Sequence, residues 1–152
     1  MSTFGSIGQP NNDGEFGSIV AIDTDSAGNV YVLDTEGSGR VKKFSSAGVY
    51  ISRYNFPTWS CTPNPGNNYN CSRPPGYPSL GSGFSSNQTG FAVVPAGDAF
   101  IVRDSLNRVM KFDMSSGYVS GSERSVSNSW GWNPSAGGSN VVLNADGTAF
   151  TA

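Results

Sequence analysis

Acidic side chains in turns and a pair of cysteines are the residues whose types and spacing could do chemistry. Asp23 and Asp25 are acids at alternate positions shortly before Gly28, an arrangement similar to the start of a calcium-binding loop. The further oxygen ligands and the late bidentate Glu of such a loop are absent from the following residues. Asp, Ser, Ala and Gly are also typical of a hairpin turn without metal. We favour the turn, and calcium is the alternative.

The sequence contains no histidine, and this excludes several classes of enzyme. Ser-His-Asp triads, Cys-His nucleophiles and His-ligated zinc or copper sites all need that side chain. The isolated carboxylates Asp13, Glu15 and Glu36 show no spacing that indicates a paired general acid and base. We therefore expect a protein that is not an enzyme and that needs no cofactor.

Cys61 and Cys71 lie in one segment rich in Pro and Asn. Without His they cannot complete a zinc site, so they form either a local disulfide or two free thiols. Low charge and an even number of cysteines favour the disulfide, which contributes at most about 2.8 kcal/mol on the chain-entropy model. Asn70 and Asn87 each begin the Asn-X-Ser/Thr pattern of N-glycosylation. These features predict a secreted or cell-surface protein.

Charge and composition restrict the partners. Nine Lys and Arg against eleven Asp and Glu give a formal net charge of -2, with a pI near 4.8. This argues against nucleic acid, because phosphate binding needs a concentrated basic surface. No stretch approaches the ~20 apolar residues of a membrane span. Residues 1–8 lack the basic start and apolar run of a signal peptide, so the protein is either cytosolic or a piece without its leader.

An internal repeat is the strongest signal in the sequence. Each of the first two units contains an apolar strand, a turn with a Gly, a second strand and a third strand, in that order. The third unit contains only the beginning of this order. The units begin at 19, 90 and 139, and their turn glycines are Gly28, Gly97 and Gly147. The glycines are 69 and 50 residues apart. The second spacing fits a four-stranded propeller blade of ~40–50 residues, and the first requires an insertion of about 20.

Each unit is expected to contain four short antiparallel strands. The first strand, Ile19–Asp23 in the first unit, is almost wholly apolar, and we expect it to be buried on both faces. The third strand alternates, so Val41 and Lys43 should face one side of the sheet and Lys42 and Phe44 the other.

The residues of the first unit also match a known repeat. The matching segments are Phe4–Gly8, Gly14–Phe16, Ile19–Asp23, Gly28–Thr35, Arg40–Val41 and Phe44. In this order they resemble an NHL repeat. The second unit keeps the order through Gly97, Phe100–Val102, Asp104–Ser105, Asn107–Val109 and Phe112. The third unit matches through its turn and part of its second strand. The resemblance implies a β-propeller, commonly with six blades.

We therefore predict an all-β fold of consecutive four-stranded antiparallel blades of an NHL-like β-propeller, incomplete in this chain. Residues 1–152 form a single partial propeller domain. Its parts are a blade at 9–54, the Cys-bearing insertion at 55–89, a blade at 90–123 and a partial blade at 124–152. A six-bladed ring needs about 240–300 residues at these repeat lengths. We expect the remainder of a longer chain or another copy to complete the ring, the latter as a homo-oligomer or filament.

Aromatic side chains in the inter-blade segments are the candidate binding residues. The loops from an outer strand to the next inner strand share one face of a propeller, and there we expect a ligand or partner face of Trp59, Tyr69, Tyr77, Trp130 and Trp132. Aromatic residues beside Asn and Ser bind glycans or protein partners by stacking and adaptable hydrogen bonds. The alternative is that these aromatics cap the blade ends and are buried.

Charged residues recur at the turn between the second and third strands. Asp34 with Arg40, and Asp104 with Arg108, are interpreted as structural ion pairs that tie strands or blades together. The expected function is thus a non-catalytic extracellular binding or scaffolding module of a larger protein or assembly. The alternative is a fragment of a metal-dependent propeller enzyme of the lyase or hydrolase type. The zinc-dependent amidating lyases with this repeat rely on His ligands, which this chain lacks.

Overall fold

The computed structural model of the 152-residue chain describes residues 5–9, 12–36, 39–57, 60–64, 68–72, 90–103, 108–120, 122, 124–125, 142–143 and 150–151. The regular structure in these residues is entirely β, and they include no helix. The prediction of an all-β fold is confirmed. None of the described residues belongs to a helix that could span a membrane.

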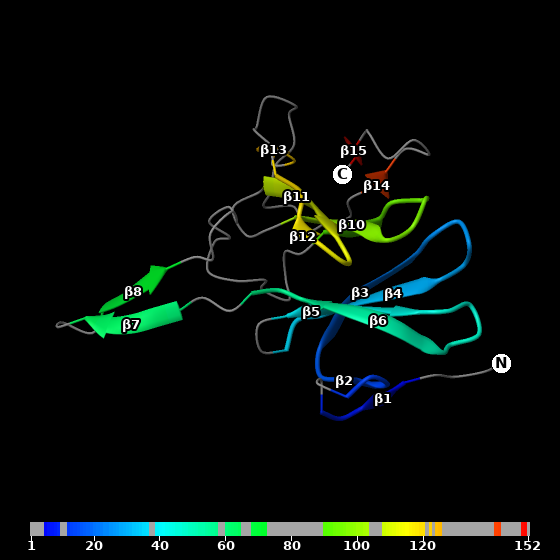
Figure 1. The fold of residues 1–152 in the computed structure, drawn as a ribbon, viewed down its shortest axis with the longest axis horizontal. Helices are drawn as coiled ribbons and strands as arrows, with labels where there is room; N and C mark the ends of the chain where they lie inside the picture. Colours follow the sequence, from blue (N-terminus) through cyan, green and yellow to red (C-terminus); the bar gives the residue numbers. More distant parts are fainter. Residues whose placement is uncertain are drawn as a thin grey trace.

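Two antiparallel sheets, one of four strands and one of five, form the body of the protein (Figure 1). The first sheet contains β3 (Ile19–Thr24), β4 (Val30–Asp34), β5 (Arg40–Phe44) and β6 (Tyr50–Asn55) in chain order. The second contains β9 (Phe91–Val93), β10 (Ala99–Arg103), β11 (Arg108–Asp113) and β12 (Gly117–Tyr118), also in chain order. The short strand β13 (Arg124–Ser125) pairs with β11, so the second sheet extends to Ser125.

The registers of the two sheets are equivalent. Tyr31 pairs with Lys43 between β4 and β5, and Phe100 pairs with Phe112 between β10 and β11. All five pairs of the first ladder map onto the second by a shift of 69 residues, the distance from Gly28 to Gly97. This shift equates Arg40 with Val109, so Arg108 lies one position before the equivalent of Arg40.

A third hairpin continues the series with β14 (Val142–Leu143) and β15 (Phe150–Thr151). Leu143 pairs with Phe150, and the pair Val93 and Phe100 lies 50 residues earlier in the second sheet. This separation equals that of Gly97 and Gly147 in the sequence. The register therefore reproduces both of the predicted spacings.

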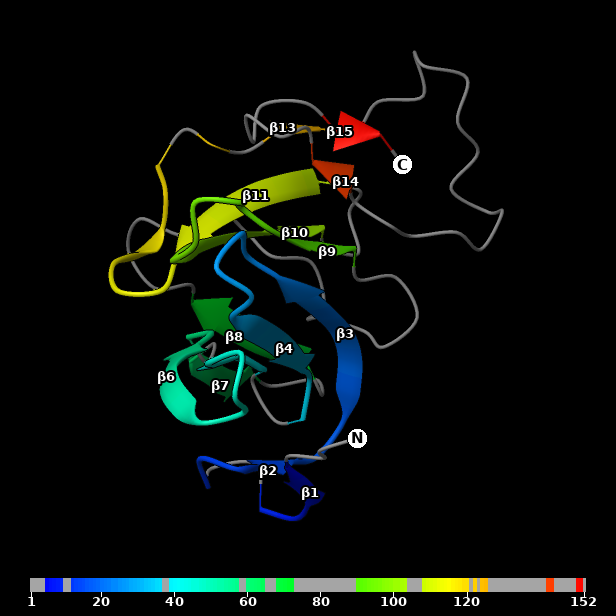
Figure 2. The same cartoon turned by 90° about the vertical axis from the view of Figure 1, so that its right-hand side faces the viewer.

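The sheets are stacked face to face and share one hydrophobic core (Figures 1 and 2). Aromatic rings fill its centre, with Tyr54 and Phe56 from the first sheet and its continuation against Phe100 and Phe112 from the second. The ring centroids of Phe56 and Phe112 are 5.2 Å apart, and those of Phe100 and Phe112 are 5.5 Å apart. Burial of each such ring stabilises the fold by about 1.5–3 kcal/mol.

The far side of the first sheet is covered by the N-terminal segment. The strands β1 (Ser6–Ile7) and β2 (Glu15–Phe16) pair in parallel, and Phe16 packs against Val32 and Phe44. The predicted alternation of β5 is confirmed, because Val41 belongs to the core between the sheets and Phe44 to the core under β2.

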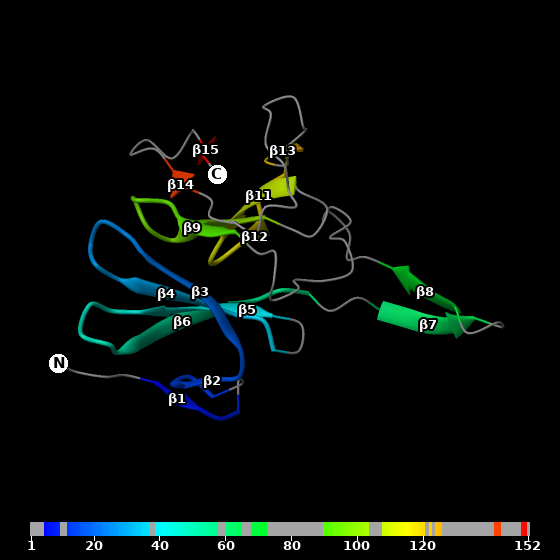
Figure 3. The ribbon, with the colours of Figure 1, turned by 180° about the vertical axis from the view of Figure 1, so that it is seen from behind.

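The first strands of successive units lie side by side, β3 beside β9 and β9 beside β14 (Figure 3). All three residues of β9 are buried, as predicted for an inner strand. The same prediction is wrong for β3, since Ile19 and Ile22 are 48 % and 61 % exposed. The reason is that β9 lies between two other first strands, whereas β3 has such a neighbour on one side only among the described residues. The described sheets do not close into a ring.

A separate hairpin lies within the predicted insertion. It consists of β7 (Ser60–Asn64) and β8 (Asn68–Ser72), which among the described residues pair only with each other. The hairpin projects away from the stacked sheets (Figures 1 and 3). The repeat thus accommodates this hairpin outside its core, whereas Phe56, near the start of the predicted insertion, belongs to the core.

Candidate functional site

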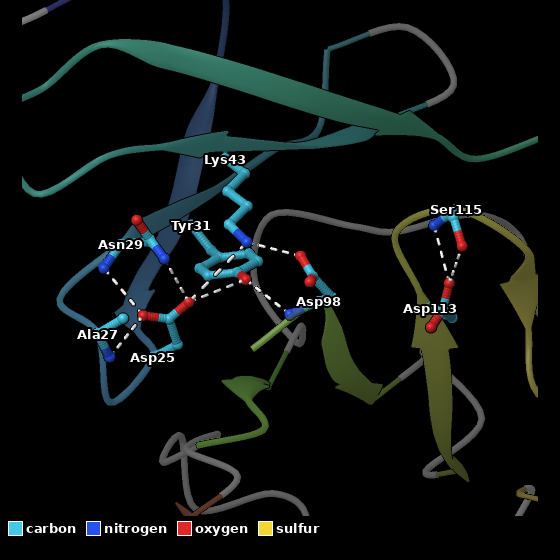
Figure 4. A network of polar contacts seen from close by, with 8 residues as sticks. All are labelled: Asp25, Ala27, Asn29, Tyr31, Lys43, Asp98, Asp113 and Ser115. Carbon is cyan, nitrogen blue, oxygen red and sulfur yellow. Dashed lines mark hydrogen bonds and ion pairs between the residues drawn. The ribbon is translucent and has the colours of Figure 1, made fainter. Parts of the chain in front are cut away.

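Asp25 begins the turn between β3 and β4, where its carboxylate accepts four hydrogen bonds (Figure 4). Oδ1 accepts the backbone N–H groups of Ala27 at 3.0 Å and Asn29 at 2.9 Å. Oδ2 accepts the side-chain amide of Asn29 at 2.8 Å and the hydroxyl of Tyr31 at 3.2 Å. This is the predicted turn chemistry, and it occupies the oxygens that calcium would need.

Tyr31 connects this turn to the second sheet. Its ring is fully buried in the core between the sheets. Its hydroxyl oxygen also accepts the backbone N–H of Asp98 at 2.8 Å. Asp98 lies in the turn between β9 and β10 at a φ of 57°, a left-handed conformation that Asp tolerates better than most residues. One hydroxyl group therefore joins the turns of two successive units.

Lys43 completes the connection from the neighbouring strand β5, where it pairs with Tyr31. Its Nζ donates to Asp98 Oδ1 at 2.6 Å and lies 4.0 Å from Asp25 Oδ2. It also lies 5.3 Å from the centroid of the Tyr31 ring, within the range of a cation–π contact. We call this cluster the Asp25 junction; it contains Asp25, Asn29, Tyr31, Lys43 and Asp98.

Burial and hydrogen bonding set the protonation states of the Asp25 junction. Burial by itself raises the pKa of Asp25, but hydrogen bonds from Asn29 and Tyr31 outweigh it, and the pKa lies below 3.8. Burial raises the pKa of Tyr31 above 10.0. Burial lowers the pKa of Lys43, but its contacts with Asp98 and Tyr31 have the larger combined effect, so this pKa lies above 10.5. At neutral pH Asp25 is ionised, Lys43 is charged and Tyr31 keeps its proton.

Further polar contacts join the first strands of the two sheets. Asp23 Oδ2 accepts the backbone N–H of Val93 at 2.7 Å. The N–H of Ser26 donates to the carbonyl of Pro95 at 2.9 Å. Gly97 allows the turns to approach closely, because a Cβ at this position would lie 2.9 Å from an oxygen of Asp25. The junction is thus part of a continuous polar seam between successive units.

Asp34, which is predicted to form an ion pair with Arg40, also binds backbone N–H groups. It is fully buried, and its carboxylate accepts backbone N–H groups from Gly17 at 3.1 Å and from Ser18 and Glu36 at 3.0 Å. Burial opposes ionisation, but these hydrogen bonds outweigh it and lower the pKa below 3.8, with a smaller contribution from the charge of Arg40.

Arg40 pairs with Asp34 in the β4–β5 register and donates from Nη2 to the carbonyl of Glu36 at 2.9 Å. Both side chains hold the turn that follows β4. The second predicted ion pair stays a prediction, because Asp104 lies outside the described residues and only the backbone of Arg108 is described.

Lys42 is a buried cation that the sequence pattern did not identify. It is fully buried on the opposite side of β5 from Lys43, where Nζ donates to the backbone carbonyls of Asn12 and Glu15. It lies 5.2 Å from the centroid of the Phe16 ring. Burial lowers its pKa below 10.5. Lys42 thus fastens the N-terminal segment to the first sheet.

The predicted ligand face stays a prediction, because most of its residues lie outside the described part of the chain. Trp59, Tyr77, Trp130 and Trp132 lie outside it, as does the predicted glycosylation site Asn87. In β8 the backbone of Tyr69 pairs with Pro63, that of Asn70 with Thr62 and that of Cys71 with Cys61. These residues stay predictions as sites, with Tyr69, Asn70 and the cysteines placed on the projecting hairpin.

The Asp25 junction was missed by sequence reasoning because its members are far apart along the chain. Tyr31 and Asp98 are separated by 67 residues and meet only when the sheets stack. Both residues closely follow a turn glycine, Tyr31 three residues after Gly28 and Asp98 directly after Gly97, and this was the one signal that could have indicated the contact. In the Asp25 junction the carboxylate of Asp25, the charged amine of Lys43 and the protonated phenol of Tyr31 all form contacts with neighbouring strands or turns. This arrangement is suited to linking strands.

Comparison with known protein families and with curated proteins finds no match for the chain. No group of three or more His, Cys, Asp or Glu side chains that could hold a metal ion occurs in the part of the chain that the structure describes.

Proposed function

We propose that the chain is a non-catalytic, extracellular binding or scaffolding module, built as an arc of an NHL-like β-propeller. Its repeat geometry supports the fold. Successive hairpins have registers shifted by 69 and 50 residues, and their first strands lie side by side in series. A propeller consists of such four-stranded sheets in radial repetition.

The use of the buried charged groups is the observation that supports a scaffold most strongly. Asp25 and Lys43 connect the two sheets, Asp34 holds three backbone N–H groups, and Lys42 fastens the N-terminal segment. A general acid or base must exchange a proton with its substrate at the working pH. Here hydrogen bonds hold Asp25 and Asp34 ionised and Lys43 charged, which suits architecture better than catalysis.

The binding function is assigned to the segment at 55–89 and to the predicted aromatic residues. The projection of β7 and β8 from the body supports this assignment, because a hairpin outside the core is available to a partner (Figure 1). The partner would be a protein or a glycan. Exposed Ile19 and Ile22 on β3 support completion of the ring, by further chain or by another copy, since an adjacent strand would cover them.

Binding is tested with a variant in which residues 60–72 are replaced by two glycines. Ser60 and Ser72 pair with each other, so the short linker can span the gap. We expect the wild-type chain either to bind members of an oligosaccharide array or to self-associate in light scattering. We expect the variant to lose oligosaccharide binding while its sheets stay folded. A folded wild-type monomer that binds no oligosaccharide would contradict the proposal.

The alternative is a fragment of a metal-dependent propeller enzyme. Elemental analysis of the purified protein separates the two classes. Stoichiometric, tightly bound calcium or zinc would favour the enzyme, whereas a metal-free preparation that retains binding supports the module. Intact mass before and after glycosidase treatment tests Asn70 and Asn87, and with them the secreted or cell-surface location.

A further inference from the structure

The β7–β8 hairpin brings the two cysteines of the chain to one register position. Cys61 pairs directly with Cys71 in an antiparallel ladder. Paired Cα atoms in such a ladder are about 4.5 Å apart at non-hydrogen-bonded positions and about 5.5 Å apart at hydrogen-bonded positions. Both values lie within the range of about 4.4–6.8 Å that a disulfide spans. The backbone therefore allows a bond between these residues without rearrangement.

Pro63 determines which kind of pair the cysteines form. It pairs with Tyr69 and has no N–H, so this position suits a non-hydrogen-bonded pair. The two kinds of pair alternate along an antiparallel ladder. The pair of Thr62 and Asn70 is then hydrogen-bonded, and the pair of Cys61 and Cys71 is again of the non-hydrogen-bonded, closer kind.

We propose that Cys61 and Cys71 form a cross-strand disulfide that fixes the register of the projecting hairpin. Two S–H bonds break and one S–S bond forms. The two protons and the two electrons pass to a disulfide oxidant such as oxidised glutathione, whose own S–S bond breaks to give two thiols. The chain contains no other cysteine, so each of these residues has one possible partner within the molecule.

The architecture gives the disulfide a physical purpose. An isolated two-stranded hairpin is marginally stable in water, and β7 and β8 pair with no third strand in the part of the chain that the structure describes. Register is weakly specified in strands rich in polar residues, which these are. A covalent link between facing residues prevents slippage. Asn70 is adjacent to Cys71 in the strand and therefore lies on the opposite face of the hairpin, so a glycan there is compatible with the link.

Peptide mapping of the intact wild-type chain, oxidised with glutathione, tests the bond. Chymotrypsin cleaves after aromatic residues, and Tyr69 lies between the two cysteines. We expect two chymotryptic peptides that are joined before reduction and separate after it, from a monomer on a non-reducing gel. Alkylation of both cysteines by iodoacetamide after oxidation would overturn the proposal. A disulfide between two chains would overturn it as well.

A displaced cysteine provides the matched control. The double variant C61S/T62C moves the thiol by one residue, which places it on the other face of the hairpin opposite Asn70. Intramolecular oxidation should then be at least about tenfold slower than in the wild type. Equal rates would show that the register does not place the thiols together. Circular dichroism should show that the two stacked sheets stay folded in both proteins, since the hairpin lies outside them.

Discussion

The backbone N–H of Asp98 donates to the hydroxyl oxygen of Tyr31 at 2.8 Å, across the interface between the two sheets. The same hydroxyl donates to Asp25 at 3.2 Å. A single oxygen atom therefore connects the turn of one repeat to the turn of the next. The contact gives the repeat architecture a polar component in addition to its aromatic core.

Tyr31→Phe should destabilise the fold by about 1–3 kcal/mol, because it removes a partner from the backbone N–H of Asp98 and from the buried carboxylate of Asp25 while the ring keeps its packing. Urea unfolding followed by circular dichroism measures the loss. Tyr118→Phe is the control, since that half-buried tyrosine packs its ring on Phe112 and is no part of the Asp25 junction. Equal losses of unfolding free energy in the two variants would show that the Asp25 junction does not stabilise the fold.

Gly97→Ala should cost more than Gly28→Ala. Both glycines have a positive φ, 82° and 78°, so both substitutions strain the backbone to a similar degree. A Cβ at Gly97 would also lie 2.9 Å from Asp25 Oδ2, whereas at Gly28 the nearest atom is 3.5 Å away. The difference in unfolding free energy, about 1 kcal/mol or more, isolates the crowding at the junction. A smaller cost at Gly97 would contradict the close approach of the turns.

Lys42→Met should loosen the N-terminal segment and leave the two sheets intact. The substitution keeps the apolar stem but removes the donor to the carbonyls of Asn12 and Glu15. Hydrogen exchange at residues 12–16 should accelerate, and exchange in β10 and β11 should not. Lys111→Met is the matched control, because Lys111 occupies the equivalent register position of the second sheet and is only half-buried. Unchanged exchange at 12–16 would show that Lys42 does not fasten this segment.

Acid should destabilise the protein below about pH 4. The hydrogen bonds from Ser115 and Ser116 lower the pKa of Asp113 from 3.8 to about 2, and the pKa values of Asp25 and Asp34 are also lowered. A carboxyl with a lower pKa in the folded state binds fewer protons there than in the unfolded chain. Its stabilisation is complete above the unfolded pKa and is lost as the pH falls through the folded one.

For Asp113 the loss extends from about pH 4 to about pH 2. Asp113→Asn should flatten the decline, since the amide oxygen still accepts the N–H groups of Ser115 and Ser116 but does not titrate. Urea unfolding at a series of pH values measures the slope. An unchanged slope in the variant would contradict the assignment.

Spacing made the repeat predictable from the sequence. Turn glycines at 28, 97 and 147 mark the hairpins whose registers are shifted by 69 and 50 residues, since a hairpin is a local structure set by its turn. The turn role of Asp25 followed from the same local chemistry. The faces of Val41 and Phe44 followed from the period of a strand.

Contacts between distant parts of the chain were not predictable in this way. The exposure of Ile22 depends on which strands flank β3, and the burial of Lys42 depends on a segment that is 27 residues away at Glu15. A lysine in a strand of alternating polar and apolar residues is expected to face solvent, unless the groups that accept its hydrogen bonds are known. The meeting of Tyr31 and Asp98 likewise depends on how two sheets stack.

Residue-resolved amide hydrogen exchange tests most directly that the stacked sheets form one scaffold, independent of the projecting hairpin. The amides to follow are those of Val93 and Asp98, which donate from the second sheet to the first. They should exchange only through global unfolding, and equally slowly when residues 60–72 are replaced by two glycines. Rapid exchange of these amides in the wild type, or loss of their protection in the variant, would contradict the account.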